Sequence, residues 1–84
     1  MGLFDKIPPV VNGPIPKDAR CQEASIFSRE SYIPCGAPAV AVIRHKRERD
    51  YYMCLGCADH NLRNRGATLV RQRKGTGLKQ RAAG

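Results

Sequence analysis

The chain of 84 residues contains no tryptophan, and its aromatic rings are limited to three tyrosines, two phenylalanines and two histidines. Six prolines and eight glycines further reduce the share of the chain that can build a regular apolar core. Small domains with so little to bury normally depend on disulfides, a metal ion or a partner for stability. The composition therefore predicts that something other than a large hydrophobic core holds this chain together.

Long apolar segments are also missing. No stretch approaches the roughly twenty apolar residues that span a bilayer, and residues 1–11 contain no apolar run of signal-peptide length. We therefore expect no membrane partner and a reducing, cytoplasmic location, where thiols bind metals more often than they form disulfides.

The four cysteines are the expected source of the missing stability. The two-residue gap in Cys54-Leu-Gly-Cys57 can place both sulfurs on one Zn²⁺ at about 2.3 Å. Eighteen residues separate Cys35 from Cys54, and zinc sites built from two ligand pairs have about fifteen to twenty residues there. The predicted ligands of one structural Zn²⁺ are therefore Cys21, Cys35, Cys54 and Cys57. Two disulfides, or a redox-active Cys-x-x-Cys, remain as alternatives, although no βαβ pattern surrounds this one.

The first pair departs from the usual spacing, because thirteen residues separate Cys21 from Cys35. Widening this loop from two residues to thirteen costs roughly 1.7 kcal/mol of chain entropy. Structural zinc contributes on the order of 10–16 kcal/mol in small fingers at neutral pH. The wide spacing is therefore compatible with a metal site.

One alternative ligand set stays open. His60 lies three residues after Cys57 and would return to the same face of a helix, so it could replace Cys21. We also expect the amides of Gly36 and Gly56, and the start of the helix, to donate hydrogen bonds to the sulfurs.

The chain divides into three parts. Residues 1–20 are rich in proline and are expected to form an extended arm, which either crosses the zinc core or docks on a partner. Residues 21–70 form the predicted zinc-binding domain. Residues 71–84 are basic, contain almost nothing to bury, and are predicted to be a disordered tail.

Within the middle part, the pattern predicts a small α+β domain. Residues 22–34 are expected to fold back on the core as a loop, and residues 37–53 to form a β-hairpin. A short helix is predicted over residues 57–65, ended by Gly66 in a left-handed conformation. A last short strand is predicted at residues 68–70.

This order of a cysteine loop, a hairpin and two ligands at a helix start resembles the treble-clef group of zinc fingers. The stretches Cys35-Gly-Ala-Pro-Ala39 and Tyr52-Met-Cys-Leu-Gly-Cys57 are similar to small zinc-finger proteins of bacteria and their phages. The resemblance implies a loop or knuckle, a hairpin and a short helix built around one structural zinc, and it covers residues 35–66. Cys21 departs from it, because the first ligand pair is stretched.

Acidic residues are absent from the last part of the chain. The net charge is +8; residues 61–84 hold seven Lys and Arg and no Asp or Glu, while residues 1–60 hold eight against seven. A nearly neutral body with a basic end is typical of proteins that meet nucleic acid, RNA or DNA, here in a regulatory role such as control of transcription. The candidate contacts are the cations of the hairpin turn, the helix end and the tail: Lys46, Arg47, Arg49, Arg63, Arg65, Arg71, Arg73, Lys74, Lys79 and Arg81.

Two further expectations concern function. Tyr51 and Tyr52 point in opposite directions on a strand, so one of them is a candidate for stacking on bases. Four sulfur ligands leave no open position on the metal, so neither an enzymatic activity nor a small-molecule substrate is expected. The alternative function is a protein–protein adaptor that docks on a larger transcription or translation machine through residues 1–20.

Overall fold

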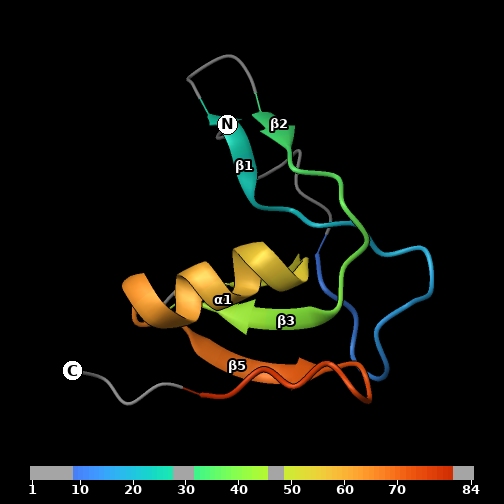
Figure 1. Cartoon of the computed structure of the whole chain (residues 1–84). Coiled ribbons are helices and arrows are strands. Elements are labelled where there is room, and N and C mark those ends of the chain that lie inside the picture. The colour runs from blue at the N-terminus through green and yellow to red at the C-terminus, as the bar shows by residue number, and fades with distance from the viewer. Residues whose placement is uncertain (1–8, 28–31, 46–48, 81–84) are drawn as a thin grey trace.

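The computed structural model describes residues 9–27, 32–45 and 49–80. Its centre is a three-stranded antiparallel sheet, in which β3 (Ala41–Arg44) lies between β4 (Asp50–Met53) and β5 (Thr68–Gln72). Helix α1 (Leu55–Asn64) covers one face of this sheet (Figure 1). A separate hairpin, formed by β1 (Ala24–Phe27) and β2 (Tyr32–Pro34), completes a small α+β fold.

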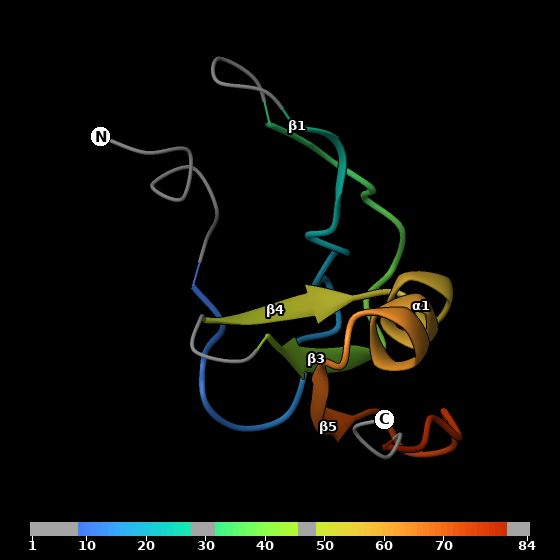
Figure 2. The same ribbon diagram turned by 90° about the vertical axis from the view of Figure 1, so that its left-hand side faces the viewer.

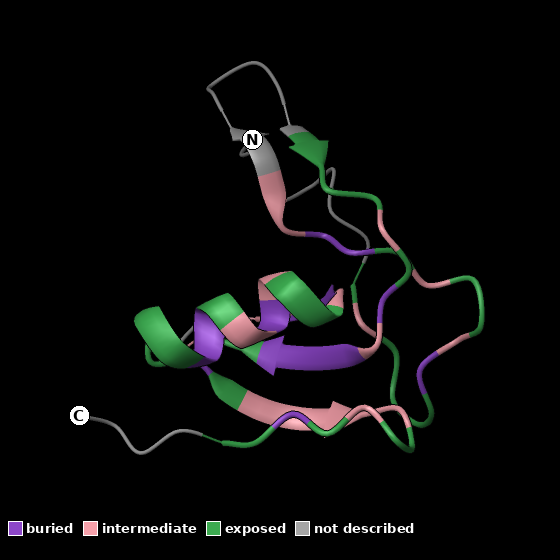
Figure 3. Ribbon diagram, viewed as in Figure 1, coloured by how far each residue is buried: buried purple, intermediate pink, exposed green. Residues whose placement is uncertain are grey.

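The predicted hairpin at residues 37–53 is confirmed by the pairing of β3 with β4. Ala41 pairs with Met53 at the open end of the hairpin, and Arg44 pairs with Asp50 at the end where the chain connects the two strands. There the Arg44 Nε donates to Asp50 Oδ1 over 2.7 Å. Ala41, Val42 and Ile43 of β3 are fully buried, because this strand is central in the sheet and covered on both faces (Figure 3). Small and β-branched residues therefore occupy it, as their strand preference predicts.

The predicted helix is also confirmed, although it begins at Leu55 and ends at Asn64. Ala58 and Leu62 are both buried and pack on Ala41 and Ile43 of the sheet. Gly66 follows with a φ of +65°, which is the left-handed conformation expected after the helix. Because α1 has only ten residues, the described part of the chain contains no helix that could cross a bilayer.

The other face of the sheet is covered by the arm, which in the structure comprises residues 9–20. Ile15 is buried in a cluster with Ala39, Val42 and Tyr52. Burying such a side chain contributes about 1.5–3 kcal/mol. Of the two possibilities left open for the arm, the structure shows this part of it lying across the chain's own core.

The predicted disorder from Arg71 onward is wrong for residues 71–80. β5 continues to Gln72, and residues 73–80 turn back beside it, with Leu78 buried in the core under α1. The Gln72 side chain both donates to the Leu78 carbonyl (2.9 Å) and accepts from the Leu78 N–H (2.8 Å). One buried leucine and this paired amide therefore order a segment whose composition suggested nothing to bury. Residues 81–84 lie outside the described residues.

The predicted loop cap at residues 22–34 is wrong as well. These residues instead form the β1–β2 hairpin, which projects away from the sheet and helix in both views (Figures 1 and 2). Ile33, which was expected to pack on the core as part of this cap, is 47% exposed. β1 and β2 pair with each other, and contact with the core is made at the base of the hairpin, where the Gln22 N–H donates to the Tyr52 carbonyl over 2.8 Å.

Candidate metal centre

The structure brings together the four cysteines that the sequence singled out. The sulfur atoms of Cys21, Cys35, Cys54 and Cys57 all lie within 4.8 Å of one another, and all four are free thiols. Two of them come from the base of the β1–β2 hairpin and two from the start of α1. Their exposure differs: Cys21 is buried, whereas Cys35 is exposed. Four sulfurs this close together can hold one metal ion.

Cys54 and Cys57 are placed by the start of the helix. Cys54 is the residue immediately before Leu55, and Cys57 lies in the first turn. The N–H of Ala58 donates to the Cys54 carbonyl over 2.9 Å, which closes that turn. The predicted position of Cys57 in the first helical turn is therefore confirmed, and local helix geometry alone brings this pair together.

Cys21 and Cys35 are placed by hydrogen bonds at the base of the β1–β2 hairpin. The Cys21 N–H donates to the Ala37 carbonyl (2.7 Å), and the Cys35 N–H donates to the Glu23 carbonyl (2.8 Å). The Gly36 N–H donates to the Cys21 carbonyl (3.1 Å), with Gly36 at a φ of +79°. These hydrogen bonds hold the two ends of the intervening thirteen-residue segment side by side. The two sulfurs therefore lie close in space although they are far apart in sequence.

The predicted donation from the start of the helix to the sulfurs is confirmed at Cys57, whereas the donation predicted for Gly36 is not. The N–H of Gly36, predicted to donate to a sulfur, is bonded to the Cys21 carbonyl. The Cys21 sulfur instead has the backbone N–H groups of Cys54 and Glu23 as partners, and the Cys54 sulfur has that of Cys57. The donors therefore come from the ligand residues and from Glu23.

The thiols differ in how readily they lose a proton. Burial raises the pKa of Cys21 to about 11, against the opposing hydrogen bonds from Cys54 and Glu23. Burial also raises the pKa of Cys57, and the neighbouring thiol of Cys54 adds to the increase. At Cys54, burial is outweighed by hydrogen bonds from the Cys57 backbone and from the surrounding thiols, so its pKa is lowered. Of Cys21, Cys54 and Cys57, Cys54 is therefore the sulfur that carries negative charge most readily.

His60, the alternative ligand, lies outside this group. It is exposed on α1, and its Nδ1 lies 3.0 Å from Nδ2 of Asn64, one turn further along the helix. Of the described residues, the group of potential metal ligands contains only the four cysteines. The geometry therefore favours Cys21 over His60.

Asn61 and Glu23 support the site and were not identified from the sequence. Asn61 is fully buried, and its Nδ2 donates to the Cys57 carbonyl (2.7 Å) and to Glu23 Oε1 (3.2 Å). Glu23 also lies 3.5 Å from Nη1 of Arg65. These contacts join the hairpin base to the helix. The available signal was the position of Asn61, a polar residue on the helix face that Ala58 and Leu62 make apolar.

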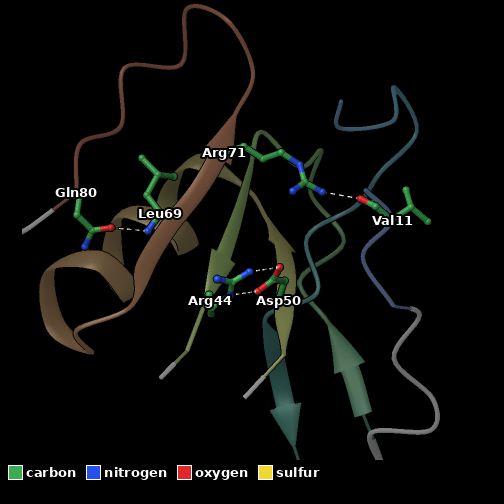
Figure 4. Close-up of polar contacts among 6 residues, drawn as sticks. All are labelled: Val11, Arg44, Asp50, Leu69, Arg71 and Gln80. Atoms are coloured by element: carbon green, nitrogen blue, oxygen red, sulfur yellow. Dashed lines mark hydrogen bonds and ion pairs between the residues drawn. The ribbon is translucent and has the colours of Figure 1, made fainter. Parts of the chain in front are cut away.

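Several of the cations predicted to bind nucleic acid form contacts within the chain. Arg63 pairs with Asp59 over 3.0 Å, and the guanidinium carbon of Arg49 lies 5.6 Å from the centre of the Tyr51 ring. Arg71 donates to the Val11 carbonyl (Figure 4), and Arg73 donates to backbone carbonyls of the arm and of Ala39. Lys74 and Lys79 are exposed. Lys46, Arg47 and Arg81 lie outside the described residues.

The candidates for base stacking are corrected by the structure. Tyr51 and Tyr52 do point to opposite faces of the sheet, but both faces are covered, so both rings are buried. The Tyr52 hydroxyl accepts from the Val11 N–H over 3.2 Å, which ties it to the arm. The expectation of one exposed ring failed because the sequence did not show that the arm covers the second face.

Comparisons with known proteins identify no relative of this chain. No protein-family model matches the chain, and neither the curated proteins nor the solved structures contain a match. Function therefore has to be inferred from the cysteine cluster and from the charges around it.

Proposed function

We propose that the four cysteines hold one structural Zn²⁺ and that the resulting domain binds nucleic acid without catalysing a reaction. The observation that carries the zinc site is the convergence of four sulfurs within 4.8 Å. Tetrahedral Zn–S bonds of about 2.3 Å place neighbouring sulfurs about 3.8 Å apart. The cluster thus needs to contract by no more than about 1 Å to close around the ion.

A structural role fits this ligand set better than a catalytic one. Four thiolates complete the tetrahedral shell of Zn²⁺, so no position is left for a water or a substrate. The ion would instead tie the hairpin base to α1. A chain so poor in aromatic residues has little apolar surface with which to join these two elements.

The arrangement also supports a treble-clef-like description. The hairpin base takes the place of the knuckle, β3 and β4 form the hairpin, and α1 carries the second ligand pair. The β1–β2 hairpin is then an insertion within the knuckle. It accounts for the wide spacing from Cys21 to Cys35.

Nucleic-acid binding is supported by charge. The chain carries a formal net charge of +8, and zinc binding to four thiolates would still leave it positive. Lysine and arginine side chains that replace counterions on phosphates give affinity that falls steeply with salt. The role we infer is regulatory, in a cytoplasmic setting.

The second candidate is an adaptor that docks on a larger machine. The observation that favours it is an apolar groove of about 640 Å³ between the arm and the hairpin base, lined in part by Pro9, Val11, Pro16 and Pro34. Against it, the arm from Val10 onward already packs on the chain's own sheet. The adaptor is therefore the weaker proposal.

The zinc site is tested by metal content measured together with a count of reactive thiols. We expect one zinc per chain, no reactive thiol in the native protein and four after unfolding in chelator. One zinc with one reactive thiol would instead indicate the His60 ligand set. A metal-free protein without free thiols would contradict the site altogether.

Nucleic-acid binding is tested by titrating the zinc-loaded chain against a labelled duplex at several salt concentrations. Four phosphate contacts predict a log–log slope of about −3.6. Absence of binding at low salt would contradict this part of the proposal. A protein partner retained through residues 1–20 would then support the adaptor.

A further inference from the structure

The cations of the described residues fall into two groups that the sequence does not distinguish. Three arginines are each paired with a carboxylate: Arg44 with Asp50, Arg63 with Asp59 and Arg65 with Glu23. These pairs include the two arginines at the helix end that were expected to meet nucleic acid. The positive charge of these three arginines is therefore largely compensated.

Around the arm, the cations are bonded differently. Arg71 donates to the Val11 carbonyl, and Arg73 donates to the carbonyls of Ala39 (3.0 Å) and Ile15 (3.2 Å) and to that of Pro16. A backbone carbonyl has no net charge, so both guanidinium groups keep their full positive charge. Within the residues that the structure describes, neither of them forms an ion pair.

The same bonds bring segments from the two ends of the chain together. Lys17 follows Pro16 and Lys74 follows Arg73, so the Arg73–Pro16 bond joins the two segments that carry these lysines. Arg20 joins them through its bridge to Pro38, next to Ala39. Lys17, Arg20 and Lys74 are all exposed, and none has an acidic partner in the described part of the chain.

We name this set the arm-face cations: Lys17, Arg20, Arg71, Arg73 and Lys74. Asp18 is the acidic residue next to them in sequence, so the surface keeps a clear positive excess. Their roles differ. The donors of Arg73 are occupied by carbonyls, so it contributes charge, whereas the exposed side chains of Lys17, Arg20 and Lys74 can contact a ligand directly.

We propose that the arm-face cations bind the phosphodiester backbone of a double-stranded nucleic acid. This inference rests on the proposed nucleic-acid function and assigns it to one face. A duplex is favoured over a single strand for two reasons. The tyrosines of β4 are buried and offer no ring on which unpaired bases could stack, and a duplex presents phosphates at higher density.

The test compares two triple variants of the full, zinc-loaded chain. K17Q/R20Q/K74Q removes the three exposed arm-face cations, and R44Q/R63Q/K79Q removes the same amount of charge elsewhere. Zinc content and circular dichroism verify that both variants fold. Binding is measured with short labelled DNA and RNA duplexes, and with the matching single strands, over a range of salt concentrations.

We expect the arm-face variant to lose up to about 2.7 from the log–log salt slope, since each lost phosphate contact removes about 0.9. The control variant should keep the slope of the unsubstituted chain, and duplexes should bind more tightly than single strands. Equal losses in both variants, no loss in the arm-face variant, or tighter binding of single strands would overturn the inference. If the unsubstituted chain binds no nucleic acid at low salt, the proposed function itself fails. Comparison of the DNA and RNA duplexes identifies which backbone is preferred.

Discussion

The two cysteine pairs reach the same point in space by different physical means. Cys54 and Cys57 are brought together by one turn of α1, so their geometry follows from local backbone structure. Cys21 and Cys35 are separated by thirteen residues. Their sulfurs lie close together only because backbone hydrogen bonds at the hairpin base hold the two segments side by side. A ligand pair can therefore be local in sequence or local in structure, and spacing rules recognise only the first kind.

The difference also appears in the environment of the sulfurs. The hairpin pair contains both the buried Cys21 and the exposed Cys35, while the helix pair is half-buried at both positions. The two pairs are joined by Asn61, which bonds to the carbonyl of Cys57 and to Glu23 beside the hairpin base. Each cysteine pair can depend to a different extent on the metal, on this link and on its own backbone.

Removal of the metal should have the largest effect. We expect chelation of the zinc-loaded protein to abolish the amide dispersion of both the hairpin base and the helix, because structural zinc contributes on the order of 10–16 kcal/mol in small fingers. NMR spectra recorded before and after chelation check this. Retention of the helix and sheet signals, with loss at Cys21 and Cys35 alone, would show that only the hairpin pair depends on the ion.

Acidification should release the metal. The raised pKa values of Cys21, about 11, and of Cys57 mean that both thiols hold their protons at neutral pH, so zinc must displace them. Affinity therefore rises with pH and falls on acidification, by about tenfold per pH unit for each proton displaced. Competition with a chromophoric chelator at several pH values measures this slope. A pH-independent affinity would contradict thiol ligation.

The Asn61→Ala substitution should weaken the link between the pairs. Loss of its bonds to Cys57 and Glu23, inside a fully buried site, is expected to cost about 1–3 kcal/mol of unfolding free energy. Asn64→Ala, at an exposed position on the same helix, is the control and should cost far less. Denaturant unfolding of the zinc-loaded variants gives both values. Equal costs would indicate that the link carries no stability.

Replacing the glycine beside each cysteine pair by alanine should change the unfolding free energy in opposite directions. Gly36→Ala places a Cβ at a φ of +79° and should destabilise by about 1–2 kcal/mol. Gly56→Ala lies in the helix with open space around it, and should stabilise by up to about 0.5 kcal/mol. Thermal melts of the two variants compare them directly. A stabilising Gly36→Ala would contradict the hairpin-base geometry.

Shortening the β1–β2 hairpin should also have a small effect. Ala24 pairs with position 34, so replacing residues 25–34 by Asn-Gly-Thr provides a two-residue turn between paired positions and supplies the backbone N–H that proline lacks. The loop between the cysteines falls from thirteen residues to six, which should stabilise the zinc-loaded form by about 0.7 kcal/mol. Metal content and unfolding free energy are the readouts. Loss of zinc binding would show that the outer part of the hairpin is needed to place Cys21.

The sequence predicted the elements whose cause is local. The β3–β4 hairpin, the short helix, the left-handed Gly66 and the position of Cys57 in the first turn all follow from residue preference and spacing. The sequence also singled out the four cysteines that the structure groups together. Each of these depends on residues a few positions apart, or on a residue type whose chemistry allows few roles.

The tertiary structure alone decided the features that depend on distant residues. The arm buries Ile15 and covers Tyr52, Leu78 orders a segment predicted to be disordered, and Arg73 is bonded to carbonyls of the arm. Nothing in the local pattern marks these pairings, because each joins segments that are far apart along the chain. Composition thus determined the excess positive charge and predicted a stabilising metal site, while long-range packing determined which of the described cations are paired with carboxylates.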